Sequence, residues 1–235
     1  MVFDGRSEAV SLALTSGGKP RVAVSRRDSW GEGVQYWTCE QNCGVVAGWT
    51  GTAVFSASRY SDARLLLDSA DRPRLMFNYG TIGGETSVYD NRLNFTWCDS
   101  DCGNQASWKG YQVGAVGDGR AGFDFALHNG AVFAATSRGV DAAVLLRCPG
   151  GCTGGSSSWT VRVLETVASF TALTPPAVPV GYTNAFWEVG SWPTVVVNPV
   201  HGTLHLTWIN SARGTAPNGK SEDGAELARI AELPL

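Results

Sequence analysis

A cysteine pair with the spacing Cys-x3-Cys recurs three times in this 235-residue chain and restricts the folds it can adopt. Turn-forming residues separate the two members of each pair, and three such residues can bring two Cα atoms within the ~4.4–6.8 Å that a disulfide needs. We therefore expect local disulfides. The alternative is metal binding, but structural zinc usually needs four converging ligands, commonly from Cys-x2-Cys pairs. The pairs are Cys39 and Cys43, Cys98 and Cys102, and Cys148 and Cys152.

Disulfides predict an oxidising compartment, so we expect an extracellular, periplasmic or cell-surface protein. The first residues, Met1 to Arg6, contain no basic segment followed by an apolar core, and they do not form a signal peptide. We expect either that a leader has been removed or that the sequence is a processed piece of a longer protein.

Each cysteine pair belongs to a longer repeat. The first cysteine of each pair and a later tryptophan (Trp49, Trp108 and Trp159) recur at intervals of 50 to 59 residues. This is the length of about four short strands, the size of a propeller blade. The sequence predicts an all-β fold, a single β-propeller domain of about four blades, each a four-stranded antiparallel sheet. The expected units are about 5–56, 57–115, 116–166, and 167–235 plus 1–4.

The N-terminal residues are expected to complete the last blade. Val2-Phe3-Asp4 is similar to Val54-Phe55-Ser56, which ends a fourth strand, and the segment Ala225 to Glu232 falls where a third strand belongs. Exchange of the N-terminal strand would close a ring without an unpaired edge. The alternative is a contiguous piece of a larger propeller.

Composition excludes several classes of protein. A hydrophobic share of 43% is too high for a disordered chain. No apolar run approaches the roughly 18 residues of a membrane span. The net charge of -3 gives no basic surface for nucleic acid.

The repeat motif resembles a bacterial extracellular β-propeller repeat, broadly of the sialidase-like and Asp-box class. The matching residues are Ser11, Leu12, Leu14, Gly18, Pro20, Tyr36, Cys39, Cys43 and Trp49. The resemblance to a sialidase would imply three arginines that bind a carboxylate, a Tyr/Glu nucleophile pair and an Asp that acts as general acid. No Asp box is intact, and Asp68 to Asp71 is only a partial match. Arg21 and Arg74 occupy equivalent repeat positions, which favours a scaffold role.

Candidate site residues are few, and no catalytic set emerges from the spacing. The alternating Asp99 and Asp101 are candidates for calcium, against the simpler interpretation of a polar turn; we expect no other metal or cofactor. Residues 175–192 form the longest segment predicted to be irregular, and loops on rigid β scaffolds often carry function. Its aromatic side chains are the candidate ligand contacts, or else they cover the end of the sheet. They are Tyr182, Phe186, Trp187 and Trp192.

The sequence therefore favours a non-enzymatic extracellular propeller that binds glycans or proteins, as an adhesion module. One alternative is a structural subunit of a cell-surface or extracellular assembly, with self-assembly among its contacts. The other is a sialidase-like glycoside hydrolase. The expected partner is a glycan or a protein, without nucleic acid or a membrane span.

Overall fold

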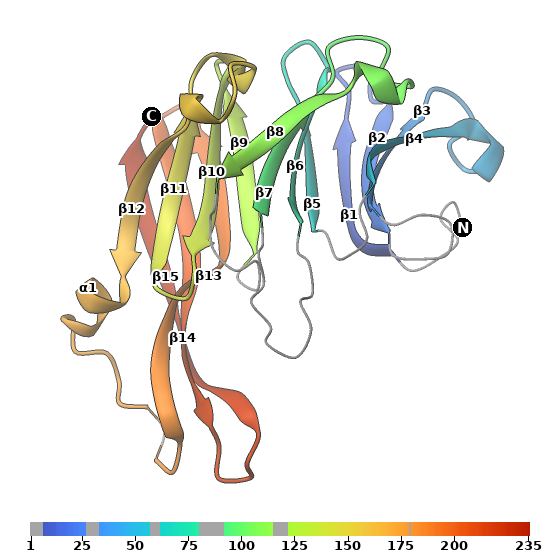
Figure 1. Cartoon of the computed structure of the whole chain (residues 1–235). Coiled ribbons are helices and arrows are strands. Elements are labelled where there is room, and N and C mark those ends of the chain that lie inside the picture. The colour runs from blue at the N-terminus through green and yellow to red at the C-terminus, as the bar shows by residue number, and fades with distance from the viewer. Residues whose placement is uncertain (1–6, 27–32, 57–61, 80–91, 115–121, 179) are drawn as a thin grey trace. The chain divides into compact units, whose positions relative to one another are not determined.

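The computed structural model describes residues 7–26, 33–56, 62–79, 92–114, 122–178 and 180–235 (Figure 1). The chain divides into two compact units, residues 1–115 and 116–235. The division falls between the second and third units predicted from the repeat. Apart from one short helix and several 3-10 turns, the described residues form antiparallel β-sheets, which confirms the all-β prediction.

The first unit contains two four-stranded sheets, each with its strands in chain order. The first sheet consists of β1 (Ser7–Leu14), β2 (Pro20–Arg26), β3 (Gly33–Cys39) and β4 (Trp49–Ser56). The second consists of β5 (Ala63–Leu67), β6 (Pro73–Tyr79), β7 (Arg92–Trp97) and β8 (Lys109–Gly114). Every neighbouring pair is antiparallel, which is the meander form of a propeller blade.

Hydrophobic residues between these two sheets form the core of the first unit. The alternation of side chains along a strand sends Leu65 and Ala63 of β5 into this core, where Phe77 of β6 joins them. Tyr36 of β3 lies edge-on to Trp108, with ring centroids 5.1 Å apart, and so links the first sheet to the second. Burial raises the pKa of Tyr36 to about 12.

All three predicted disulfides are present, and their paired Cα atoms lie 5.6–5.7 Å apart. Each one closes the loop between the third and fourth strands of its sheet. The recurring tryptophan follows this loop, and its indole nitrogen donates to the carbonyl of the second cysteine: Trp49 to Cys43 at 2.9 Å and Trp108 to Cys102 at 3.1 Å. The loops also contain the 3-10 turns Val46–Gly48, Gln105–Ser107, Gly150–Cys152 and Ser156–Ser158.

The second unit contains a four-stranded and a three-stranded sheet. The former consists of β9 (Phe123–His128), β10 (Ala131–Arg138), β11 (Ala142–Cys148) and β12 (Thr160–Thr166). The latter consists of β13 (Thr183–Asn198), β14 (Thr203–Thr215) and β15 (Ser221–Pro234). β15 confirms the predicted third strand of the last blade. The predicted strand exchange involves residues 1–4, which lie outside the described residues.

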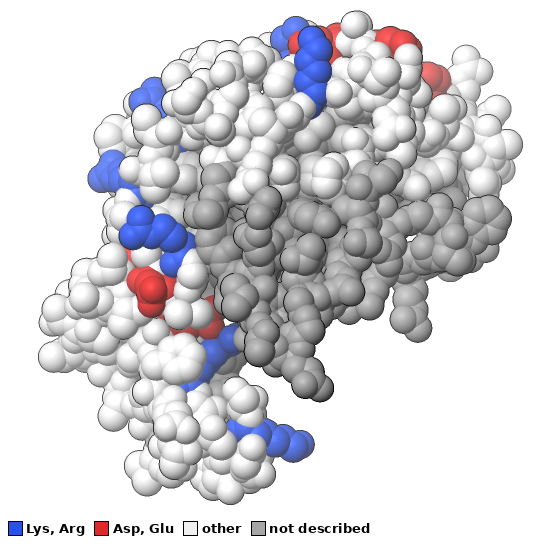
Figure 2. Space-filling view, viewed as in Figure 1, with Lys and Arg blue, Asp and Glu red and all other residues white. Residues whose placement is uncertain are grey.

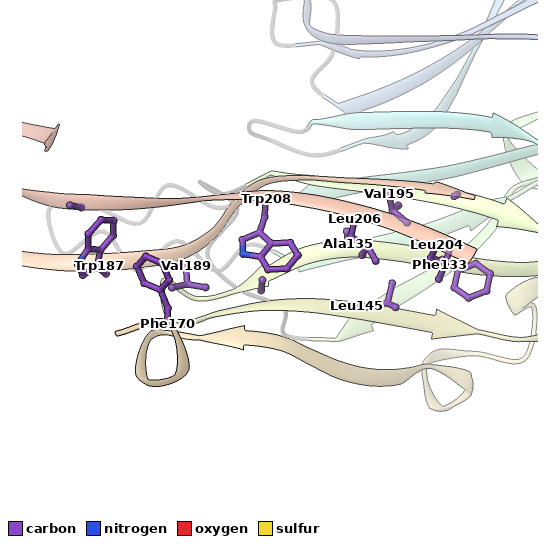
Figure 3. Close-up of a cluster of buried hydrophobic side chains, with 13 residues drawn as sticks. Phe133, Ala135, Leu145, Phe170, Trp187, Val189, Val195, Leu204, Leu206 and Trp208 are labelled. Atoms are coloured by element: carbon purple, nitrogen blue, oxygen red, sulfur yellow. The ribbon is translucent and has the colours of Figure 1, made fainter. Parts of the chain in front are cut away.

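The core of the second unit lies between its two sheets, and its side chains come from both (Figure 3). Phe133 and Leu145 face Val195, Leu204 and Leu206 there. At one end of this core is helix α1 (Val167–Thr171), which begins with a capping box between Thr166 and Ser169 and buries Phe170.

No helix among the described residues is long and apolar enough to cross a membrane. The described surface in Figure 2 is mostly uncharged, and basic and acidic side chains both occur on it. This distribution agrees with the low charge content of the sequence.

Candidate functional site

The segment predicted to be an irregular loop is, in large part, a strand. The prediction for residues 175–192 was wrong from Thr183 onward, where the 16-residue β13 begins. Gly190 and Pro193 are typical of loops, but the strand accommodates them through β-bulges, with register shifts between Val189 and Ser191 and between Ser191 and Thr194. Gly190 has φ of 95°, and a Cβ at this residue would lie 2.8 Å from the Cα of Ala143.

The four candidate aromatic residues differ in burial. Trp187 is buried in the core of the second unit, where its ring meets Phe170 edge-on at 5.0 Å (Figure 3). Its packing there agrees with the alternative role of covering the end of the sheet. Phe186 and Trp192 are exposed, and Tyr182 is half-buried in the turn before β13. The prediction of a ligand surface therefore depends on these three residues.

An arginine outside the predicted candidates lies beside one of them. Phe186 on β13 is directly opposite Arg213 on β14. A Cβ on Gly214, the next residue of β14, would come within 3.2 Å of Cδ1 of Tyr182. Successive side chains of a strand point to opposite faces, so Tyr182 lies on the face opposite Arg213. Arg213 is 31% exposed, so part of its side chain reaches the surface beside Phe186. We name Phe186 and Arg213 the aromatic–arginine site.

A buried carboxylate holds this arginine in place. Glu188 is 1% exposed, and its Oε2 lies 2.8 Å from Nε of Arg213. The hydroxyl of Ser191 donates to the other oxygen of Glu188 at 3.3 Å. This buried ion pair fixes the planar guanidinium. A planar cation beside an aromatic ring suits a ligand that carries both an anionic group and an apolar ring face, as acidic sugars do.

A second buried carboxylate, Glu165 of β12, lies at the opposite face of the β13–β15 sheet. It accepts hydrogen bonds from Trp208 Nε1 at 3.0 Å and Asn210 Nδ2 at 2.8 Å. Arg229 of β15 adds an ion pair at 2.6 Å. Burial raises the pKa of Glu165, but these hydrogen bonds, with that of Arg229 foremost, outweigh burial and hold the pKa below its usual value. The group is an anion that joins the two sheets of the unit.

The candidate calcium residues lie in a different network. Asp99 Oδ1 accepts from Nη2 of Arg74 at 2.9 Å, and the same nitrogen donates to Asp68 at 2.8 Å. The buried Arg74 also donates to the carbonyl of Cys98 at 3.3 Å. Asp101 is exposed. Among the described residues, no three His, Cys, Asp or Glu side chains are placed to hold a metal ion.

This network repeats in the first sheet, which supports the scaffold role expected for Arg21 and Arg74. Arg21 donates to the carbonyl of Cys39 at 3.3 Å and pairs with the adjacent Glu40. Each arginine therefore binds the start of a disulfide loop. In the partial Asp-box match, Asp68 Oδ1 accepts hydrogen bonds from the backbone N–H groups of Ala70 and Arg72. These bonds shape the turn between β5 and β6.

Comparisons with known proteins identify the fold. No family model and no curated protein matches the sequence. Among solved structures, the chain is similar to the intramolecular trans-sialidase from Ruminococcus gnavus in complex with oseltamivir carboxylate, with a TM-score of 0.53 and 10% identity over 97% of this chain and 45% of that one.

Two further similar structures are named an α-L-arabinofuranosidase and an α-L-arabinanase. One is the α-L-arabinofuranosidase from Podospora anserina, with a TM-score of 0.48 and 11% identity over 98% of this chain and 65% of that one. The other is the α-L-arabinanase from Penicillium chrysogenum, with a TM-score of 0.47 and 12% identity over 96% and 63%. This chain spans less than two thirds of each of these proteins. Its fold is of the β-propeller type, as predicted.

Proposed function

We propose that this chain recognises glycosides as part of a sialidase-like, glycan-processing propeller protein. The observation that carries the proposal is the likeness to the trans-sialidase over nearly the whole chain. It favours the hydrolase alternative over the adhesion module, because the similar solved structures named above are enzymes that act on glycosides. The three disulfides are consistent with an oxidising compartment. We therefore propose an extracellular location.

The aromatic–arginine site supports the choice of an acidic glycan. Phe186 would offer a ring face to a sugar, and Arg213 directly opposite it would attract the carboxylate of that sugar. We place ligand binding at this site and assign no described residue to bond cleavage. Glu165 is buried and its carboxylate is engaged by Trp208, Asn210 and Arg229, so we assign it a structural role.

The test measures turnover. The protein is incubated with 4-methylumbelliferyl glycosides of sialic acid and of arabinofuranose, and fluorescence is followed over time. We expect release from the sialoside, and at least tenfold less release with Arg213→Gln. As the matched control, Arg162→Gln changes an exposed arginine on β12 of the same unit. Release that is equal in Arg213→Gln and the control would contradict the assignment of the site.

A second candidate function is glycan binding without turnover. The observation that favours it is that arginines engage both glutamates that are buried among the described residues of the second unit, Glu165 by Arg229 and Glu188 by Arg213. A glycan array would then show binding to acidic glycans that Phe186→Ala weakens, while no glycoside is cleaved. Absence of both binding and turnover would remove both candidates.

A further inference from the structure

The two sheets of the first unit place a glycine at the same position of their fourth strands. Gly51 and Gly110 each lie two residues after the recurring tryptophan. Each glycine is directly opposite the residue that lies two positions before the first cysteine of its sheet, Trp37 for Gly51 and Thr96 for Gly110. The two pairs are therefore equivalent in the repeat, and they differ in the residue that faces the glycine.

In the first sheet, an indole ring covers this glycine. A Cβ on Gly51 would lie 2.7 Å from Cδ2 of Trp37, so the ring occupies the space that a side chain would need. The indole nitrogen of Trp37 donates to Oε1 of Gln35 at 3.2 Å. A glycine and a side-chain amide together therefore form a place that holds one indole ring with its N–H group paired.

The second sheet keeps the glycine and an amide but has threonine in place of the tryptophan. Thr96 and Asn94 occupy the positions of Trp37 and Gln35, and a cavity of about 270 Å³ lies against both of them. Thr96 is buried, and a Cβ on Gly110 would lie 2.7 Å from its hydroxyl oxygen. Any larger residue at this position of β8 would therefore intrude on the cavity. The position itself is exposed, so the cavity opens at the surface.

Aromatic side chains form the other walls of the cavity. Phe77 and Trp108 line it from the second sheet, and Phe55 lines it from the first, with the rings of Phe55 and Phe77 5.1 Å apart. The pairing of β3 with β4 skips Val54, and this bulge lets both Val54 and Phe55 pack against the second sheet. All these walls belong to one compact unit. They offer ring contacts to an occupant whose polar edge would meet the amide.

We propose that this cavity binds a small heteroaromatic molecule of the indole class, a fused flat ring system with one N–H group. The ring would take the place that Trp37 fills in the first sheet, with its faces and edges against the aromatic walls. Its N–H group would donate to the side-chain oxygen of Asn94. An amide oxygen has two lone pairs, so this bond is compatible with a second one made within the protein.

The size of the cavity restricts the occupant to one ring system. Its volume of about 270 Å³ is below the roughly 300–1,000 Å³ of pockets that hold drug-sized ligands. The site lies in the first unit, whereas the aromatic–arginine site lies in the second. The proposal is therefore independent of the proposed function, and either can fail without the other.

Fluorine NMR with 5-fluoroindole as the probe tests the proposal, because the fluorine signal broadens when the small molecule binds the protein. We expect one bound molecule per chain with a dissociation constant of about 0.1–1 mM, as suits so small a ligand. The comparison probe is 5-fluorobenzofuran, which has nearly the same shape but no N–H group. It should bind about fivefold more weakly, which is the effect of one hydrogen bond.

Two variants locate the probe. Thr96→Trp places an indole where the first sheet has one and should weaken binding of 5-fluoroindole at least tenfold. Thr153→Trp is the matched control, because Thr153 is an exposed threonine of the second unit. Asn94→Leu should bind the two probes equally well, because the preference for the N–H group depends on the amide. Circular dichroism checks folding, and Thr96→Phe or Asn94→Ala replaces a variant that is not folded.

Three results would overturn the proposal. One is a wild-type chain that leaves the fluorine signal of 5-fluoroindole unchanged. Another is a folded Thr96→Trp variant that binds the probe as the control does, because the probe would then lie elsewhere. The third is an Asn94→Leu variant that still prefers 5-fluoroindole over 5-fluorobenzofuran, because the N–H group would then not meet this amide.

Discussion

Removal of the Glu165 carboxylate should destabilise the second unit strongly. In Glu165→Ala, the guanidinium of Arg229 loses its ion pair, and Trp208 Nε1 and Asn210 Nδ2 lose their acceptor. Breaking a buried ion pair by removing one partner costs roughly 3–5 kcal/mol. Arg229 is 34% exposed, so water reaches it and the ion-pair cost falls below this range. With the two lost hydrogen bonds, at about 1 kcal/mol each, we expect a total near 3 kcal/mol.

Urea denaturation followed by near-ultraviolet circular dichroism measures this loss. With a slope of about 2 kcal/mol per molar urea, the midpoint should fall by about 1.5 M. Glu232→Ala is the matched control, because Glu232 is an exposed glutamate on β15 and its loss should change stability by less than about 0.5 kcal/mol. Glu165→Gln retains an oxygen acceptor and should lie between the two.

The pH dependence has a definite sign. The folded state holds the pKa of Glu165 below its usual value, so the folded form binds the proton less readily than the unfolded form. The carboxylate therefore stabilises the fold above the unfolded pKa of about 4.3, and this contribution is lost as the pH falls through the folded pKa. The difference between wild type and Glu165→Ala should shrink at pH 3. A variant as stable as the control at pH 7, or a difference unchanged at pH 3, would refute this reasoning.

Three other predictions concern the first unit. Arg74→Ala should cost about 3 kcal/mol and Arg21→Ala about 1 kcal/mol in urea denaturation, because Arg74 is buried between two carboxylates whereas the partner of Arg21 is exposed. Replacing Cys98 and Cys102 by serine should cost about 2 kcal/mol, as expected for so short a loop, and reductant should abolish the difference from wild type. Burial raises the pKa of Tyr36 to about 12, so stability is retained below pH 10 and falls between pH 10 and 12; Tyr36→Phe should reduce that fall.

The fold could be predicted because its determinants are local and repeated. The cysteine spacing fixes each disulfide loop, and the following tryptophan marks the start of the fourth strand, as Trp49 and Trp108 both show. Alternation of apolar residues marks the strands themselves. These signals act over a few residues, so three occurrences in one chain were enough to divide it into blades.

The candidate site could not be predicted because strand register assembles it. Arg213 lies 27 residues beyond Phe186 in the sequence, and only the pairing of β13 with β14 brings them opposite each other. The bulges at Gly190 and near Trp192 shift that register, and no sequence pattern specifies where a bulge falls. The one available signal was Glu188, a carboxylate in a largely apolar stretch, since a buried charge requires a partner.

One position of the repeat holds a different kind of side chain in the second sheet. Ser11, Arg64, Asp124 and Thr194 occupy one position in the four sheets, as the strand registers and the junctions between sheets indicate. Serine, aspartate and threonine can accept a backbone N–H, but a guanidinium has no acceptor. Arg64 instead pairs with Asp62 at 2.9 Å, within its own sheet. The side chain at this position of the second sheet therefore makes its polar contact within its own sheet, whereas Ser11 and Asp124 each accept a backbone N–H from the other sheet of the same unit. Every strand of the second sheet still forms, so strand formation does not require an acceptor at this position.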